Sequence, residues 1–191
     1  MISRLINLFI FLITLIILAL FFRKDGKWDT EKARNAFRYF TVLSNTFCAI
    51  SALLMSINPA SRVFWMLKYI GTVSVTVTML TVFFFLMPAY KTIGGLLKGY
   101  DLFMHLLTPL MAAISLCLFE RHPISILAAT SGVIPVFVYG LWYLYQIIYA
   151  PEEKRWEDFY RFNMGGKWPI SFVAMIAATF LICLGYWTIL R

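Results

Sequence analysis

Two polar stretches in an otherwise apolar chain contain the residue types needed for nucleophilic chemistry. The first holds Thr41 and Asn45, and the second holds Asp101 and His105. Residues four apart share one face of a helix, so each stretch presents one polar pair. A histidine can take the proton of a hydroxyl, a carboxylate can orient the ring, and an amide can donate to an oxyanion. We therefore predict Thr41 as nucleophile and His105 as base, with Asn45 and Asp101 in supporting roles.

The same four side chains also have structural interpretations, which the residue types alone leave open. A threonine near a helix start caps it or bonds back to a carbonyl one turn earlier, and intramembrane Thr and Asn often join helices. Asp101 can be a solvent-exposed N-cap, and His105 can bond to a neighbouring helix. Tyr139, Tyr143 and Gln146, at roughly helical spacing, either line a cavity or form a packed face.

The composition predicts that these pairs lie in a membrane protein. The chain has 191 residues, of which 61% are hydrophobic and 14% charged, whereas soluble domains carry about 25% charged residues. Successive runs meet the requirement of about 20 mostly apolar residues for a membrane-spanning helix. They are Leu5–Phe22, Phe37–Ile57, Leu67–Met87, Leu102–Phe119, Ile124–Tyr149 and Pro169–Leu190. The expected fold is an all-α, polytopic bundle of six transmembrane helices, forming a single domain over residues 1–191.

The basic residues predict the orientation of this bundle. Twelve of the 17 Lys and Arg residues lie in the loops 23–38, 88–101 and 150–168, which alternate helices place on one side. The positive-inside rule predicts that this side is cytoplasmic and that both termini are outside. Lys68 is counted among the few charges of the opposite side, and residues 151–158 are expected to form a short interfacial helix. Basic residues that flank membrane spans suit anionic lipid head groups, so membrane lipids and no nucleic acid are the expected partners.

Both polar pairs open spans that start from the same side of the membrane. At 1.5 Å per residue, Thr41 and His105 each lie roughly 5 Å inside their spans. The two polar faces can therefore meet in one leaflet. The cysteines Cys48, Cys117 and Cys183 fall in separate predicted helices without metal-ligand spacing, so we expect no metal and no cofactor.

The motif Arg38-Tyr39-Phe40-Thr41 with Asn45, followed by His105 in a His-x-x-x-Pro context, resembles the androgen-induced-gene family of intramembrane hydrolases and related bacterial six-helix proteins. The eukaryotic members of that family cleave fatty acid esters of hydroxy fatty acids with a threonine nucleophile and a histidine. By position, the resemblance implies these roles for Thr41 and His105. This chain departs from the family pattern because it lacks a second histidine shortly before His105.

The expected function is therefore an intramembrane threonine-type esterase that acts on a lipid ester. Two alternatives stay open. One is a small transporter or channel in which the Thr, Asn, Asp and His side chains form a polar binding site. The other is a lipid-binding membrane protein without catalysis.

Overall fold

The computed structural model describes residues 1–90 and 95–191, and within them it has six helices that are long and apolar enough to cross a membrane. The spans are Ile2–Phe21, Phe40–Ile57, Arg62–Ala89, Tyr100–Phe119, Ile126–Tyr149 and Trp168–Leu190. The protein is an all-α polytopic membrane bundle, as the sequence predicted. Lys91, one of the basic residues of the second basic loop, lies outside the described residues.

Three spans are single helices and three combine α-helix with tighter or wider turns. The single helices are α1 (Ile2–Phe21), α3 (Phe40–Ile57) and α10 (Trp168–Leu190). The third span consists of α4 (Arg62–Thr81), η1 (Val82–Leu86) and α5 (Met87–Tyr90). The fourth consists of α6 (Tyr100–Leu102), η3 (Phe103–Leu107), α7 (Thr108–Ile114) and η4 (Ser115–Phe119). The fifth consists of α8 (Ile126–Ala129), η5 (Thr130–Val133), α9 (Ile134–Leu144) and η6 (Tyr145–Tyr149). The segments η1, η3, η4 and η6 are π-helical, a geometry that is frequent at functional sites.

The connections differ from expectation at three places. The first basic loop contains a small antiparallel hairpin, β1 (Arg23–Lys24) and β2 (Lys27–Trp28), and a short helix, α2 (Thr30–Ala36). The prediction of an interfacial helix at 151–158 is wrong, because that segment forms only the 3-10 turn η7 (Glu152–Lys154). A second 3-10 turn, η8 (Met164–Gly166), precedes α10. The third span begins at Arg62, so Lys68 lies inside it and not among the loop charges.

Helix α4 is the centre of the bundle. On one side it packs with α1, α3 and α7 around a small core of Ile10, Cys48, Ala52, Val75 and Ala112. Gly71 permits the close approach of α3, because a Cβ there would lie 2.8 Å from the Ser51 hydroxyl oxygen, as small residues do at membrane helix contacts.

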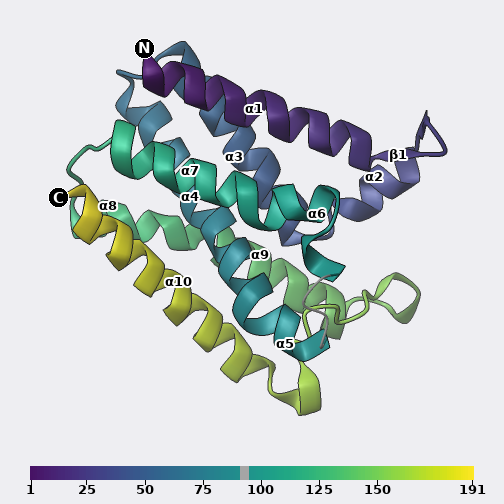
Figure 1. Cartoon of the computed structure of the whole chain (residues 1–191). Coiled ribbons are helices and arrows are strands. Elements are labelled where there is room, and N and C mark those ends of the chain that lie inside the picture. Colours follow the sequence, from purple (N-terminus) through teal and green to yellow (C-terminus); the bar gives the residue numbers. More distant parts are fainter. Residues whose placement is uncertain (91–94) are drawn as a thin grey trace.

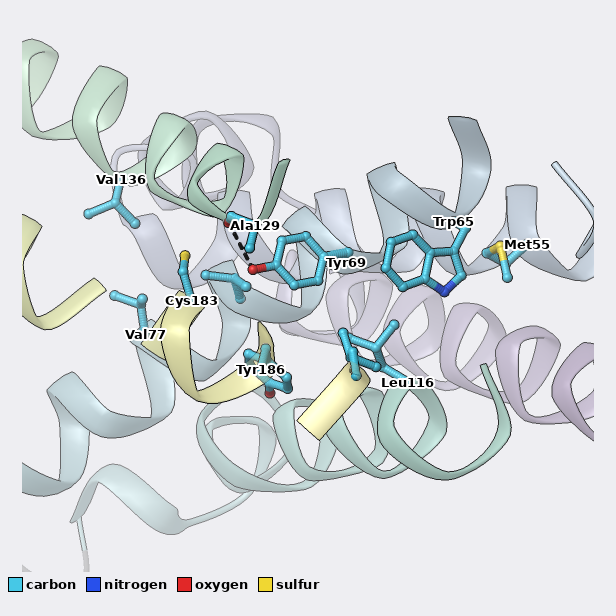
Figure 2. Packing of buried hydrophobic residues seen from close by; sticks show 11 residues of the cluster. Met55, Trp65, Tyr69, Val77, Leu116, Ala129, Val136, Cys183 and Tyr186 are labelled. Carbon is cyan, nitrogen blue, oxygen red and sulfur yellow. Dashed lines mark hydrogen bonds between the residues drawn. The ribbon is translucent and has the colours of Figure 1, made fainter. Parts of the chain in front are cut away.

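On its other side, α4 packs against η4, α8, α9 and α10 through a second cluster that contains Trp65, Tyr69 and Cys183. Figure 2 shows Tyr69 within this cluster, its hydroxyl donating to the Ala129 carbonyl at 2.8 Å. Figure 1 shows the two chain ends and α8 at one end of the bundle, and the hairpin, α2 and α6 at the other. The candidate site residues lie toward this second end.

Candidate active site

Thr41 is the second residue of α3, nearer the helix end than the sequence suggested, because residues 37–39 are not part of the helix. The N-cap residue Tyr39 makes no side-chain cap, so the first amide groups of α3 need acceptors from elsewhere. One is supplied by a distant loop: the amide of Phe40 donates to the Tyr160 hydroxyl oxygen at 3.0 Å. The loop that precedes α10 is thereby fastened to the helix end that carries Thr41.

Three hydroxyl groups converge at this helix end. The hydroxyls of Thr41 and Tyr139 both face the Tyr160 oxygen. The Tyr139 hydroxyl also donates to the Arg38 carbonyl at 2.8 Å, which ties α9 to the residues just before α3. Thr41 is half-buried. Its hydroxyl therefore lies in a group of polar donors and acceptors at the edge of the apolar bundle.

Asp158 holds the loop that presents Tyr160. One of its carboxylate oxygens accepts from the Tyr143 hydroxyl at 2.9 Å and from the Phe162 amide at 2.8 Å. The other accepts from the Asn163 amide at 2.7 Å. The Tyr143 hydroxyl in turn accepts from the Tyr160 amide at 3.2 Å. A chain of hydrogen bonds thus runs from the carboxylate through Tyr143 to Tyr160, whose ring is packed 5.3 Å from that of Tyr143.

Burial raises the pKa of Tyr160 to about 12, while the hydrogen bond from the Phe40 amide and the hydrogen bonds shared with the Tyr139 and Thr41 hydroxyls act in the opposite direction. The phenol therefore stays protonated over the physiological range. It can donate one hydrogen bond as well as accept them.

The raised pKa makes a prediction about stability at alkaline pH. An unfolded tyrosine loses its proton near pH 10, and Tyr160 in the fold loses it near pH 12. The folded state thus holds this proton more tightly, and its stabilising contribution is complete below about pH 10 and falls as the pH rises toward 12. We expect the difference in melting temperature between wild type and Tyr160→Phe to shrink over that interval. A difference that is constant from pH 9 to 12 would contradict this assignment.

A large apolar cavity opens beside the hydroxyl cluster. Its volume is about 780 Å³, within the range of roughly 300–1,000 Å³ typical of small-molecule sites. Its walls come from α3, α4, η1, α9 and α10, and its polar lining includes Thr41, Tyr139, Tyr143 and Tyr160 as well as the hydroxyl residues Thr78, Thr81, Ser171 and Thr179. Two of its lining residues, Phe84 and Ile170, are 78% and 68% exposed. Because exposed apolar residues of a membrane span face lipid, the cavity opens sideways toward the acyl chains of the bilayer.

His105 lies in the π-helical turn η3 and is buried. Its Nδ1 atom is 2.8 Å from the Leu96 carbonyl oxygen. When Nδ1 carries the proton and donates it to this carbonyl, Nε2 keeps the lone pair that a general base needs. The ring is not part of the cavity wall described above. Asp101, which is partly buried, interacts electrostatically with His105.

Asn45 links the two halves of the candidate site. Its Nδ2 atom donates to the Thr41 carbonyl at 2.8 Å and to the Met104 carbonyl at 3.0 Å. The residue before His105 is thereby joined to the first turn of α3. Both bonds engage the amide nitrogen that an oxyanion would require, so Asn45 acts in this structure as a bridge between helices.

The structure thus brings the backbones of Thr41 and His105 together through Asn45, and it places the Thr41 hydroxyl beside Tyr160. Over the described residues, no hydrogen bond joins that hydroxyl to the His105 ring. The catalytic pair stays a prediction. Tyr139 and Tyr143 line the cavity and also belong to a packed cluster, whereas Gln146 does not line the cavity. Tyr160 was missed because a lone tyrosine in a polar loop carries no periodicity or spacing that marks it.

The described residues contain no group of three or more His, Cys, Asp or Glu side chains placed to hold a metal ion. Comparison of the chain with known proteins gives no family: no protein-family model, no curated protein and no solved structure matches it.

Proposed function

We propose that the protein is an intramembrane hydrolase that cleaves ester bonds of lipids, with Thr41 as the nucleophile. The observation that carries this proposal is the position of Thr41 in the polar lining of a large, mainly apolar cavity that opens toward lipid. An acyl chain entering from the bilayer would fill the apolar part and bring its ester group to Thr41, Tyr139 and Tyr160. Binding of this kind positions the reacting atoms before the chemical step.

In the proposed reaction, the Thr41 oxygen attacks the ester carbonyl carbon and its proton passes to a base, for which His105 is the candidate. The carbon–oxygen bond to the alcohol breaks, and the alcohol leaves with that proton. Water then attacks the acyl-threonine ester and releases the fatty acid, which restores the Thr41 hydroxyl. The protonated phenol of Tyr160 is suited to donate a hydrogen bond to the oxyanion formed in each half-reaction.

The resemblance of the Thr41 and His105 motifs to the androgen-induced-gene family supports the same reaction and points to fatty acid esters of hydroxy fatty acids as the substrate class. Such a substrate is mostly hydrocarbon with one internal ester, which fits a mainly apolar cavity that has hydroxyl groups in its wall. We also propose that the loops 23–38, 88–101 and 150–168 are cytoplasmic, because they hold most of the Lys and Arg residues. The site would then serve substrates from the cytoplasmic leaflet.

Filling the cavity should block this activity. Ala178 on α10 lines the cavity, whereas its neighbour Ala177 does not; both are exposed on the helix surface. We expect Ala178→Phe to lower turnover of a long-chain ester strongly, because the ring occupies the volume that the acyl chain needs. Ala177→Phe should leave turnover near the wild-type value.

The measurement is hydrolysis of a long-chain ester by both variants in detergent or lipid nanodiscs, with melting curves to verify folding. A short-chain ester, which needs less of the cavity, should be affected less by Ala178→Phe. If both variants hydrolysed the long-chain ester equally well, the cavity would not be the substrate site.

A second candidate function is lipid binding without catalysis. One observation favours it: His105 bonds to Leu96 and no hydrogen bond joins it to Thr41 over the described residues. In that case, Ala178→Phe would still abolish binding of a fluorescent fatty acid ester, but wild type would show no turnover. Turnover that disappears on loss of the Thr41 hydroxyl would exclude this candidate.

A further inference from the structure

A set of buried polar atoms inside the other half of the bundle has no hydrogen-bond partner among the described residues. They are Asn7 Oδ1 and Thr14 Oγ1 on α1, Asn45 Oδ1 on α3, Lys68 Nζ on α4 and Glu120 Oε2 at the end of η4. Four of them belong to the spans that surround the small core of α1, α3, α4 and α7, and Glu120 directly follows the span that contains α7. A polar atom that is buried without a partner destabilises the fold, and more so when it is charged. So many in one bundle require a physical explanation.

Lys68 and Glu120 are the most costly of these groups. Lys68 is 0% exposed and Glu120 is 4% exposed. One carboxylate oxygen of Glu120 is well satisfied: it accepts from the hydroxyls of Ser115 at 2.7 Å and Ser3 at 3.0 Å, and from the Asn7 amide. The other carboxylate oxygen and the Lys68 ammonium are left without partners.

The two charged groups lie in the same part of the bundle. The Trp65 indole, one helical turn before Lys68, donates to the Glu120 carbonyl at 2.6 Å. Both charges also act electrostatically on the Cys48 sulfur. Asn7, whose amide nitrogen bonds to Glu120, has its own oxygen unpartnered. An unpartnered cation and two unpartnered acceptors therefore lie near the same end of the bundle, on α4, on α1 and just after η4.

The unpartnered atoms lie at different distances along the axis of the bundle. Lys68 lies about 9 Å along α4 from the end of the bundle that holds Glu120, at 1.5 Å per residue. Thr14 lies about 10 Å further along α1 than Asn7, on the same face because the two are seven residues apart. Asn45 lies about 7 Å from the opposite end, at the start of α3. These groups therefore occur at several depths inside the same half of the bundle.

We propose that the region around Lys68 and Glu120 is an internal water-binding site. Buried water makes about three hydrogen bonds to polar groups that otherwise lack partners, and water can both accept from the Lys68 ammonium and donate to the Glu120, Asn7 and Asn45 oxygens. A metal cation is disfavoured by the ammonium, and an anion by the carboxylate. Water satisfies both charges, so it is the occupant that the chemistry selects. The inference does not depend on Thr41 being a nucleophile.

Two native cysteines provide a matched test. Cys48 and Cys183 are both 0% exposed. Cys48 lies on α3, which packs against the helix that carries Lys68, within electrostatic range of Lys68 and Glu120, whereas Cys183 belongs to the Tyr69 cluster, none of whose described members has an unpartnered buried polar atom. X-ray radiolysis converts bound water into hydroxyl radicals that oxidise nearby sulfur. In the full-length protein in nanodiscs, we expect millisecond exposure to oxidise Cys48 several-fold faster than Cys183, as measured by mass spectrometry. Equal rates would overturn the proposal.

A double variant then tests which groups hold the water. Lys68→Met with Glu120→Gln removes both buried charges at once, so neither is left alone in the bundle, which single variants would do. We expect the oxidation rate of Cys48 to fall to that of Cys183, with the melting curve verifying the fold. A Cys48 rate that stays several-fold above that of Cys183 in the folded double variant would overturn the assignment to Lys68 and Glu120. The wild-type comparison of the two cysteines decides the main point without any variant.

Discussion

Thr41→Ala is expected to abolish ester turnover, lowering it by about 10³-fold or more, because the proposed reaction has no other nucleophile. Thr41→Ser should keep part of the activity, since it preserves the hydroxyl and changes only the methyl group. The fold should survive both changes, because the bonds that tie Thr41 to Asn45 use its backbone carbonyl and not its side chain. The measurements are hydrolysis of a long-chain ester and labelling by a fluorophosphonate probe, which reacts with activated hydroxyl groups.

The matched control is Thr46→Ala. Thr46 lies five residues further along the same helix, is partly buried and does not line the cavity. Its hydroxyl bonds back to the Val42 carbonyl at 2.7 Å, which is a purely local contact. Labelling that is equally strong in wild type and Thr41→Ala would refute the nucleophile. His105→Ala should slow turnover and labelling together if this ring is the base, and should leave labelling unchanged if its only role is the bond to Leu96.

Asp158→Ala is expected to have the largest effect on stability among loop substitutions. The carboxylate accepts from the Tyr143 hydroxyl and from the amides of Phe162 and Asn163, so three donors would lose their partner. Each unsatisfied donor that stays buried costs about 1–3 kcal/mol, although water will reach some of them in the loop. We expect the free energy of unfolding to fall by about 2–4 kcal/mol.

The same change should also lower ester turnover, because Asp158 acts through Tyr143 on the position of Tyr160. Glu157→Ala is the control: Glu157 is the exposed acidic neighbour in the same loop, and its loss should alter neither property. Asp158→Asn keeps one acceptor oxygen and should fall between wild type and alanine in detergent melting curves. If Asp158→Ala melted as the wild type does, the loop would not depend on this carboxylate.

The sequence indicated the two helices of the candidate site but not its loop. Apolar runs of about 20 residues have one stable solution in a bilayer, which is a helix whose backbone groups bond within the segment. That constraint is local, so the all-α fold and the positions of Thr41 and His105 near the starts of two spans could be predicted. The contribution of Tyr160 could not, because it depends on a contact between residues 120 positions apart.

Lys68 shows the limit of interpreting charge from sequence. Lys68 is the seventh residue of its span. When the start of a span is judged from hydropathy, flanking polar residues shift the apparent boundary. A lysine near that boundary is therefore counted as a loop charge. In the fold, α4 begins at Arg62 and Lys68 lies fully buried beside the helices that carry Asn7 and Cys48. Burial of a side chain is decided by its neighbours on other helices, which no single segment contains.

By itself, then, the sequence determined the class of the fold, the approximate spans and the two polar faces at Thr41/Asn45 and Asp101/His105, because each follows from local composition and helical periodicity. Only the tertiary structure decided that Asn45 bridges two helices, that Tyr160 meets Thr41 in the wall of a mainly apolar cavity, and that Lys68 and Glu120 share the inside of the bundle. These features depend on which helices pack together and at what depth, and packing is settled by the whole set of helices at once.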